Sequence, residues 1–391
     1  MTSPRDESLT ATNSISSSAN PERVLLIFGT RPEAIKLCPL IRALRAYGSR
    51  TLEPVVCVTG QHREMLDQVL AAFQVQPHYD LDLMQPNQSL PELGARLLTG
   101  LPRVFAEVKP ALAVVQGDTA TTLYGALGAF YARVPVAHVE AGLRTFDMKL
   151  PFPEEMNRVL TGRLTALHFA ATEWARDNLL REGIPASAIE VTGNTGIDAV
   201  LSVKASLESG SLQGAPLPLD DCKRLIVVTA HRRESFGAGF DRICSGIARI
   251  AARGDVQVIW PVHPNPNVQK TVRATFNGSP SVLLTEPLSY VPFVDLMRRA
   301  YLLITDSGGV QEEGPSLGKP ILVLREKTER PEAVEAGTVK LVGTDPDLMA
   351  REAKRLLDDR AEYDRMSRLH NPYGDGRASE RIARRIAEYL V

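Results

Sequence analysis

"VLLIFG" at residues 24–29 and "EPVVCVTG" at residues 53–60 enclose "EAIKLCPLIRALRAY" at residues 33–47, and this alternation decides the fold. The two apolar runs are typical of buried strands, whereas the segment between them has a helical pattern. A second helical pattern, "REMLDQVLAAF" at residues 63–73, follows. Strands that alternate with helices predict βαβ units, and therefore a parallel sheet.

The same rhythm occurs twice along the chain. It continues through "ALAVVQGD" and "VPVAHVE", pauses near residues 189–198, and gives way to a polar segment at residues 206–221. A second series then contains "RLIVVTA", "VQVIWPV", "SVLLTE", "YLLITD" and "ILVLRE". We predict an α/β protein with two doubly wound, Rossmann-like domains that face a central cleft. The predicted parts are a disordered tail at residues 1–20, an N-terminal domain at 21–195, a C-terminal domain at 196–372, and a helix at 373–391 that returns to the N-terminal domain.

Composition excludes several classes of protein. The chain has 391 residues, is 44% hydrophobic and carries a formal net charge of -1, so it has no broad attraction for nucleic acid or an anionic membrane surface. Its four cysteines, at positions 38, 57, 222 and 244, have no C-x-x-C spacing, which argues against a disulfide framework or a structural zinc site. The first twenty residues lack the apolar core of a signal peptide, and no apolar run has the length of a membrane span. We predict a cytoplasmic protein.

A glycine pair lies between two apolar runs in "TDSGGVQEEGPSLGKP" at residues 305–320. Gly308 and Gly309 could serve only a turn that needs backbone angles closed to other residues. The alternative, which we favour, is nucleotide binding, because the helix after such a strand points unpaired N–H groups at phosphate. Glu313 would then lie one helical turn further on, within reach of a ribose hydroxyl.

The first strand leads into "FGTRPEAIK", which has the signature of a helix start. Thr30 and Glu33 have the spacing of a capping box, and Pro32 suits the first helical turn. Arg31 therefore lies at the mouth of the sheet, where a helix N-terminus also favours anions. Lys36 follows about one turn inside the helix, and a solvated surface cation is an equally good interpretation of it.

Three acidic residues occupy similar positions in the N-terminal domain. Asp118 closes "AVVQGD", Glu140 closes "VAHVE", and Glu154 opens the helix of "PFPEEMNRVL". If their strands are neighbours, the three carboxylates converge on one crevice. The alternative is that each acid caps a helix or pairs with Arg158 or Arg144.

Helical spacing separates the two adjacent glutamates of that helix. Glu154, Asn157 and Arg158 share one face, whereas Glu155 is turned about 100 degrees away. Glu154 is therefore the better candidate for catalysis.

Basic residues follow strands of the C-terminal domain. His231, Arg232 and Arg233 come directly after "LIVVTA" and could neutralise a diphosphate, and Gly237 and Gly239 precede the next helix. Arg330 lies in a loop beyond another strand, where it could close over a ligand or pair with neighbouring glutamates. No metal-ligand spacing, Walker P-loop, G-x-G-x-x-G after a strand, or G-x-S-x-G is present.

These motifs together resemble one family. "FGTRPEAIKLCPL", "TGQHREMLDQVL", "HVEAGLRT", "PFPEEMNR", "TAHRRESFG", "TDSGGVQEEGPSLGKP" and "TERPEAVEAGT" are similar, in this order, to segments of the bacterial non-hydrolysing UDP-N-acetylglucosamine 2-epimerases. The resemblance covers all of the chain except the tail. It implies a GT-B type fold, a UDP-sugar in the cleft, a homodimer, and no cofactor or metal.

The resemblance also assigns roles to residues. It implies that Ser307, Gly308, Gly309 and Glu313 hold the diphosphate and ribose, and that Phe293 lies near uracil. Leu288 departs from the family, because a relative has a polar side chain there, near the base. The remaining implied sets are phosphate contacts at Arg31, His231 and Arg330, further substrate contacts at Lys36 and Arg158, and catalytic groups at Asp118, Glu140, Glu154 and His231.

The implied reaction is the interconversion of UDP-N-acetylglucosamine and UDP-N-acetylmannosamine by elimination of UDP, through 2-acetamidoglucal, for bacterial surface polysaccharide synthesis. Three alternatives stay open at this point: a GT-B glycosyltransferase, a hydrolysing 2-epimerase, and a non-catalytic sensor of nucleotide sugars. The resemblance further implies an allosteric site for a second UDP-N-acetylglucosamine at Gln61, Glu64, Arg96 and His263.

Overall fold

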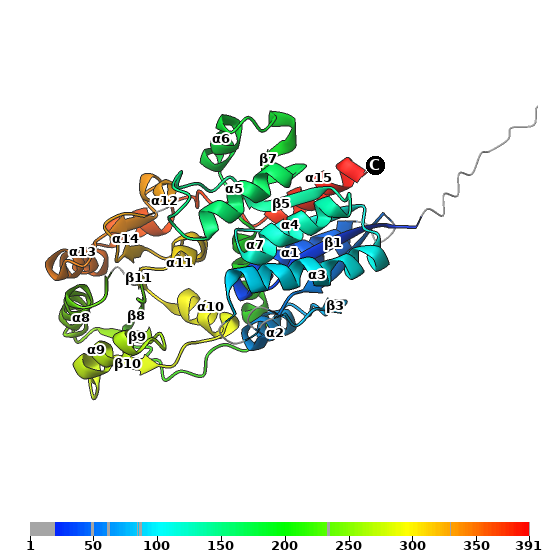
Figure 1. Cartoon of the computed structure of the whole chain (residues 1–391). Helices are drawn as coiled ribbons and strands as arrows, with labels where there is room; N and C mark the ends of the chain where they lie inside the picture. The colour runs from blue at the N-terminus through cyan, green and yellow to red at the C-terminus, as the bar shows by residue number, and fades with distance from the viewer. Residues whose placement is uncertain are drawn as a thin grey trace, which may run out of the picture.

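The computed structural model describes residues 20–47, 51–60, 63–83, 85, 88–232, 235–328 and 330–390, with the backbone alone at residues 63 and 64. Within these residues the chain forms two β-sheets covered by helices, in two halves that lie side by side (Figure 1). This confirms the predicted α/β class with two doubly wound sheets. The tail predicted at residues 1–20 lies outside the described residues, apart from residue 20.

The first sheet has the strand order β3-β2-β1-β4-β5-β6-β7, and its neighbouring strands run parallel. Its strands are β1 (Glu22–Phe28), β2 (Leu52–Val58), β3 (Tyr79–Asp80), β4 (Leu112–Gln116), β5 (Val136–Ala141), β6 (Leu167–Ala170) and β7 (Ile189–Val191). The helices between them are α1 (Arg31–Tyr47), α2 (Arg63–Ala72), α3 (Leu90–Val108), α4 (Ala120–Tyr131), α5 (Glu154–Leu164), α6 (Glu173–Arg181) and the 3₁₀ turn η1 (Ala186–Ala188).

The second sheet has the order β10-β9-β8-β11-β12-β13 and is also parallel. Its strands are β8 (Arg224–Thr229), β9 (Val256–Pro261), β10 (Val282–Thr285), β11 (Leu302–Thr305), β12 (Ile321–Val323) and β13 (Val339–Leu341). The associated helices are α7 (Thr195–Glu208), α8 (Ala238–Ala251), α9 (Pro266–Phe276), α10 (Tyr290–Arg299), α11 (Gly308–Glu313), η3 (Gly314–Leu317), α12 (Pro331–Glu335), α13 (Pro346–Asp358), α14 (Arg360–Ser367) and α15 (Ala378–Leu390).

Four strands were not predicted from the apolar runs: β3, β6, β7 and β13. They contain only two to four residues each, and a polar or charged residue stands among them, whereas the equally short β10, β11 and β12 each contain three consecutive apolar residues. The central strands gave the clear signal because both of their faces are covered. In β1, the side chains from Val24 to Phe28 are all fully buried, which makes a continuous apolar run.

Two helices connect the halves. α7 packs against α1 and α15 on one side and against α10 and α11 on the other. α15 follows the helices of the second half in sequence but packs against α1, and Figure 1 shows it beside the elements of the first half. Its start is fixed to α7, because the Asp198 carboxylate accepts hydrogen bonds from the backbone N–H groups of Ala378 and Ser379 at 3.3 and 2.7 Å.

Candidate functional site

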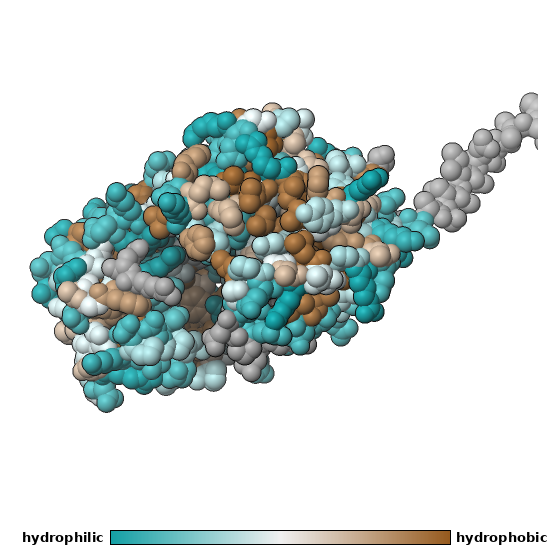
Figure 2. Space-filling model, viewed as in Figure 1, coloured by the Kyte–Doolittle hydropathy of each residue, from teal (hydrophilic) through white to brown (hydrophobic). Residues whose placement is uncertain are grey.

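The order of strands reverses once in each sheet, between β1 and β4 in the first and between β8 and β11 in the second. In open parallel sheets such switch points create the crevice at the carboxyl ends of the strands where ligands bind. Arg31 and Asp118 follow β1 and β4, whereas His231 and Ser307 follow β8 and β11. These four predicted site residues therefore lie at the two switch points, and Figure 2 shows the surface hollowed between the two halves.

The start of α1 has the predicted capping box. Thr30 N–H donates to Glu33 Oε2 at 2.7 Å, and Glu33 N–H donates to Thr30 Oγ1 at 3.5 Å. Glu33 is also buried, and its other oxygen accepts a bond of 2.7 Å from the hydroxyl of Thr119 beyond β4. This carboxylate joins the ends of β1 and β4, so it fixes where Arg31 and Asp118 stand.

Asp118 lies close to the other predicted acids. Its Oδ2 accepts a bond of 3.3 Å from Arg158 Nη1, and its backbone oxygen accepts one of 2.8 Å from the Asn157 side chain. Burial raises the pKa of Asp118 to about 6 against the opposing effect of Arg158, and the charges of Glu140 and Glu154 raise it further. A carboxyl group with such a pKa can exist in both protonation states near neutral pH.

Glu140 is held in a strained backbone conformation within β5. Its φ is +64°, in the left-handed region, and the pairing of β5 with β6 shifts register between Val139 and Ala141. Such a bulge re-aims a side chain at a cost of roughly 1–3 kcal/mol. The carboxylate accepts a bond of 2.5 Å from Lys36 Nζ and a second from the Gln116 amide. A carboxylate that is placed by a strained backbone and has two donors on one oxygen is typical of a functional position.

The two glutamates at the start of α5 have different environments, and the one predicted to be turned away from Arg158, Glu155, is the one that binds it. Glu155 is buried, accepts the backbone N–H groups of Thr145 and Phe146, and binds Arg158 Nε at 2.6 Å. Glu154 is partly exposed on the face that carries Arg158. Arg158 therefore binds Glu155 and Asp118 and positions the latter.

Arg144 does not pair with the three acids, contrary to the alternative raised from sequence. It is bound by both oxygens of Glu182, at 2.6 and 2.9 Å. The three strand-end carboxylates are therefore free of this cation.

At the second switch point His231 lies against a buried aspartate. Asp306, which follows β11, is fully buried and contacts His231 Nδ1 at 2.9 Å. The ring of His263 stacks on that of His231, with centroids 5.3 Å apart. His263, predicted for the allosteric site, thus lies beside His231, predicted for catalysis. Arg233 lies outside the described residues.

The glycine pair starts α11 without unusual backbone angles. Neither Gly308 nor Gly309 has a positive φ, so the simple explanation that the turn needs glycine conformations is wrong. A Cβ on Gly308 would lie 2.6 Å from Cζ of Arg330, whereas a Cβ on Gly309 would meet no atom closer than 4.0 Å. Gly308 is required by the close approach of Arg330, and the space beside Gly309 is open. Gly239, expected before a helix, lies inside α8.

The adjacent glutamates of α11 have different environments. Glu312 accepts 2.7 Å and 2.9 Å bonds from Arg330 Nε and the Asn194 amide, and Lys36 Nζ lies 4.0 Å away. Burial opposes ionisation of Glu312, but Arg330 and Lys36 outweigh it and hold its pKa below the ordinary value. Burial and the charge of Glu312 raise the pKa of Glu313 to about 8. Arg31 acts in the opposite direction, which places it near Glu313.

The remaining predicted residues lie at the periphery or outside the described part. Leu288 and Phe293 are partly buried against the core beside α10. Arg96 donates to the backbone oxygen of Leu83 at 3.4 Å. Gln61 and the side chain of Glu64 lie outside the described residues, so the predicted allosteric set is only partly visible.

Sequence reasoning missed the residues that hold these groups in place. Asp306 and Glu312 bind His231 and Arg330, and Glu332 joins the halves by accepting bonds from Thr172 at 2.9 Å and Tyr373 at 3.2 Å. Asp306 directly follows an apolar run, and that signal could have identified it. The partners of Glu312 and Glu332 lie far away in sequence, and no local pattern indicates them.

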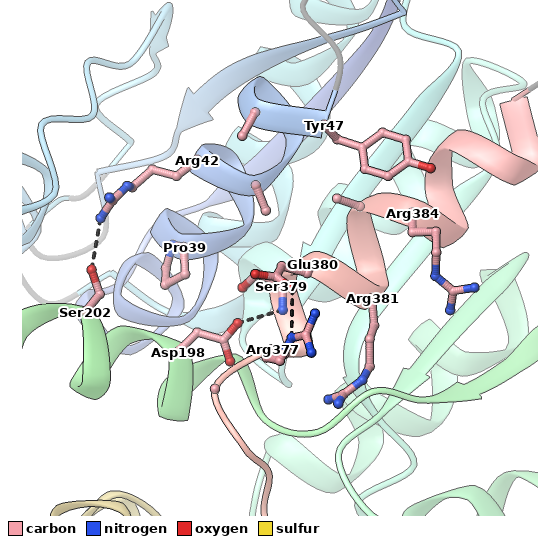
Figure 3. Close-up of a pocket in the computed structure, with 14 residues that line it drawn as sticks. Pro39, Arg42, Tyr47, Asp198, Ser202, Arg377, Ser379, Glu380, Arg381 and Arg384 are labelled. Atoms are coloured by element: carbon pink, nitrogen blue, oxygen red, sulfur yellow. Dashed lines mark hydrogen bonds and ion pairs between the residues drawn. The ribbon is translucent and has the colours of Figure 1, made fainter.

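A cavity of about 770 Å³ lies away from this site, between α1, α7 and α15 (Figure 3). Its arginines are engaged: Arg42 binds Ser202, Arg377 binds Glu380, and Arg381 binds Asp375. We therefore assign the function to the switch points. In the described part of the chain no group of three or more His, Cys, Asp or Glu could hold a metal ion, and no helix is long and apolar enough to cross a membrane.

Comparison with known proteins agrees with the geometry. The family model described as UDP-N-acetylglucosamine 2-epimerase matches residues 45–387. The chain belongs to this epimerase family. It is 53% identical to UDP-N-acetylglucosamine 2-epimerase of Salmonella typhimurium over 375 residues, which cover 94% of this chain and 99% of that protein. This confirms the family indicated by the sequence motifs.

Solved structures of the epimerase family have the same fold. The UDP-GlcNAc 2-epimerase of Neisseria meningitidis, solved bound to UDP-GlcNAc, superposes with a TM-score of 0.85 at 44% identity and covers 94% of this chain and 100% of that one. A UDP co-structure from S. aureus superposes with a TM-score of 0.81, also at 44% identity, and covers 94% and 97%. The match confirms the predicted GT-B type arrangement.

Proposed function

We propose that the protein interconverts UDP-N-acetylglucosamine and UDP-N-acetylmannosamine by inverting C2 of the sugar, without hydrolysis. The proposal rests on the different side chains that the two sheets present at the crevice between them. We call the carboxyl ends of the strands of the first sheet the first edge, which carries the carboxylates Asp118, Glu140 and Glu154. The corresponding ends in the second sheet are the second edge, which carries His231 and Arg330 beside the glycines of α11. A nucleotide sugar that spans the crevice would place its sugar at the first edge and its diphosphate at the second.

The proposed reaction is an elimination followed by an addition. The hydrogen at C2 has little acidity, because it is not next to a carbonyl group. The C1–O bond breaks and its electron pair leaves with UDP, while a carboxylate takes the C2 proton and the C–H pair forms the C1–C2 double bond of 2-acetamidoglucal. UDP then adds back to C1 and a proton is delivered to the opposite face of C2. No net oxidation occurs, so the chemistry requires no redox cofactor.

Proton transfer is the role that we assign to the first edge. Asp118, with its pKa raised to about 6, is suited to give and take a proton near neutral pH. Glu140 forms a salt bridge of 2.5 Å with Lys36, in which two largely buried groups of opposite charge stabilise each other. The salt bridge is short, and the pKa of Lys36 is raised by Glu140 and Glu312 against the effect of burial. Glu154 is the third candidate for the C2 proton.

Stabilisation of the leaving group is the role of the second edge. Negative charge grows on the diphosphate as the C1–O bond breaks, and cations fixed beforehand stabilise it. We assign this to His231 and Arg330, with Arg31 contributing from the first edge, and the loss of one preorganised donor typically costs about 3 kcal/mol. Ser307, Gly308 and Gly309 would present backbone donors to the diphosphate, and Glu313 would bind the ribose. Phe293 and Leu288 would lie on the uracil side.

Incubation with UDP-N-acetylglucosamine in heavy water tests the function. We expect deuterium at C2 of both epimers, with UDP retained in the nucleotide sugar, as measured by proton NMR. Stoichiometric free UDP and N-acetylmannosamine would indicate the hydrolysing reaction. No exchange at C2 would contradict epimerisation and leave a glycosyltransferase or a sensor.

We further propose that the protein works as a homodimer in the cytoplasm and supplies surface polysaccharide synthesis. A dimer is supported by large apolar side chains that stand out from the first half: Phe146, Leu150 and Phe152 are each at least 60% exposed. Figure 2 shows hydrophobic residues grouped over the region of α4 and α5. Exposed apolar patches of this kind mark interaction sites. Light scattering should give twice the mass of 42.7 kDa, and a monomer at micromolar concentration would contradict the proposal.

Activation by a second UDP-N-acetylglucosamine is the last part of the proposal. His263 stacks directly on His231, so a ligand that touched it would touch the group beside the diphosphate. A ligand that contacts both halves favours their closed arrangement. The initial rate from pure UDP-N-acetylmannosamine should therefore be low and should rise on addition of a trace of the other epimer. A full rate without that trace would contradict the proposal.

A further inference from the structure

Both carboxylate oxygens of Asp306 contact other groups. Its Oδ2 accepts the backbone N–H groups of His231 and Arg232, at 2.6 and 2.8 Å, and its Oδ1 faces His231 Nδ1 at 2.9 Å. The side chain is completely buried between the ends of β8 and β11. Burial opposes its ionisation, but the bonds and charge of His231, with the backbone donors, hold its pKa below the ordinary value. Asp306 is therefore an ionised acceptor in a rigid position.

We propose that Asp306 is the positioning residue of His231: it fixes the orientation and tautomer of the ring so that Nε2 faces the leaving diphosphate. The proposal rests on the proposed function, in which His231 acts on that diphosphate. An ionised carboxylate has no proton to donate, so the Nδ1 that faces it must carry one. The proton on Nδ1 leaves Nε2 as the nitrogen that faces the cleft. In the proposed role Nε2 carries a proton as well, so that the ring is a cation balanced by Asp306 and donates to the diphosphate.

Neighbouring residues restrict the ring further. His263 covers one face of the His231 ring, nearly parallel to it at 16°. The backbone of His231 is anchored to the same carboxylate that contacts its ring, so a shift of the backbone would lose a hydrogen bond to Asp306 and a shift of the ring would lose a 2.9 Å contact with it. Asp306 also directly precedes Ser307 and the glycine pair of α11. One carboxylate thus sets the position of His231 relative to the proposed phosphate site.

The structure selects Asp306→Asn as the test variant. The amide oxygen must take the place of Oδ2, because that position accepts two backbone N–H groups. The amide NH₂ then replaces Oδ1 and faces Nδ1 of His231. Since both groups cannot donate to each other, Nδ1 must accept from the amide, and the ring can carry a proton only on Nε2. The variant keeps the backbone contacts and removes the doubly protonated, cationic form of the ring.

The kinetic test compares Asp306→Asn, His231→Gln and the double variant. We expect kcat of Asp306→Asn to fall by about 10²- to 10⁴-fold, with UDP affinity within threefold of wild type. The double variant should be no slower than His231→Gln, because Asp306 acts only through that ring. An unchanged kcat in Asp306→Asn, or losses that multiply in the double variant, would overturn the proposal.

A matched control comes from Asp198, which also accepts two backbone N–H groups and is largely buried, but lies at the start of α15. Asp198→Asn should keep the wild-type kcat. If it lost as much activity as Asp306→Asn, the loss would reflect general damage and the proposal would fail.

Nitrogen NMR of ¹⁵N-histidine-labelled protein tests the tautomer without any substrate. We expect Nδ1 of His231 to be protonated in wild type, with the signal assigned by its absence from His231→Gln. A wild-type ring with a bare Nδ1 would overturn the proposal, even if Asp306→Asn does not fold. An inactive wild-type protein would instead refute the proposed function and leave this measurement decisive for Asp306.

Discussion

The two edges of the crevice use acidic side chains in opposite ways. At the first edge, Asp118 feels the charges of Glu140 and Glu154, and its pKa is raised to about 6. At the second edge, Asp306 and Glu312 are buried, their pKa values lie below the ordinary ones, and they contact His231 and Arg330 respectively. The first group of acids is arranged for proton exchange, whereas the second holds donors in place.

The difference explains how one crevice can bind an anion and still contain many carboxylates. Asp306 accepts two backbone N–H groups and contacts His231, and Glu312 is paired with Arg330, so they add little repulsion where we place the diphosphate. Glu313, next to Glu312, avoids a second charge because its pKa is raised to about 8. At the first edge Asp118 and Glu140 also contact cations, Arg158 and Lys36, but burial and the neighbouring acids still raise the pKa of Asp118 to about 6, where it can exchange a proton.

The largest expected effect concerns the first edge. Glu154→Gln should lower exchange at C2 by about 10²- to 10⁴-fold, while UDP affinity measured by calorimetry stays within a few-fold of wild type. The reason is that we place Glu154 at the sugar, away from the diphosphate. Near wild-type exchange in the variant would remove Glu154 from the mechanism.

At the second edge, Glu313→Ala should affect UDP binding, whereas Glu154→Gln at the first edge should affect the exchange of the C2 proton. It should weaken UDP binding, because the loss of one partner of a buried hydrogen bond costs roughly 1–3 kcal/mol. Calorimetry with UDP alone measures this effect. Unchanged affinity would place the ribose away from Glu313.

A smaller effect, on the free energy of unfolding, should distinguish the two glycines at the start of α11. Gly308→Ala should lower the free energy of unfolding by about 1–3 kcal/mol, because the new Cβ displaces Arg330 and leaves Glu312 short of a partner. Gly309→Ala should be neutral or stabilising by up to about 1 kcal/mol, since its Cβ enters open space. Urea unfolding of both variants measures the difference. Equal losses would show that Arg330 is not what requires Gly308.

The smallest effect is a difference in the pH dependence of stability. Glu313 keeps its proton up to pH about 8 in the folded state, whereas its ordinary value is 4.5. The unfolded state therefore releases the proton first, and the stability of wild type relative to Glu313→Gln should decline as pH rises from 4.5 to 8. The stability of wild type relative to Asp118→Asn should decline in the same way, but this decline should end near pH 6, the raised pKa of Asp118. Denaturation curves over pH 4–9 measure both, and windows that coincide would contradict the distinction between the edges.

Much of this arrangement could be predicted from the sequence, because its signals are local. Apolar runs such as residues 24–29 mark the buried strands, and residues that follow such runs lie at the edge of the sheet. Asp118, Glu140 and His231 were found in that way. The strained φ of Glu140 has no such signal, because it depends on how β5 pairs with β6.

The long-range contacts also lay beyond sequence reasoning. Arg330 reaches over Gly308 from a separate loop, so the sequence could show a glycine there but not its reason. The partners of Glu332, Thr172 and Tyr373, come from segments 160 and 41 residues away. Only the packing of the two halves brings these side chains together.

The central claim is that the second edge holds UDP while the C1–O bond breaks and the first edge exchanges the C2 proton. UDP-N-acetylglucosamine carrying ¹⁸O in the bridge between C1 and the β-phosphorus tests it directly. If UDP departs and adds back, rotation of the freed β-phosphate moves ¹⁸O from the bridge into non-bridging positions, which phosphorus NMR detects. We predict this scrambling at a rate comparable to C2 exchange. Inversion at C2 with ¹⁸O retained entirely in the bridge would contradict the account.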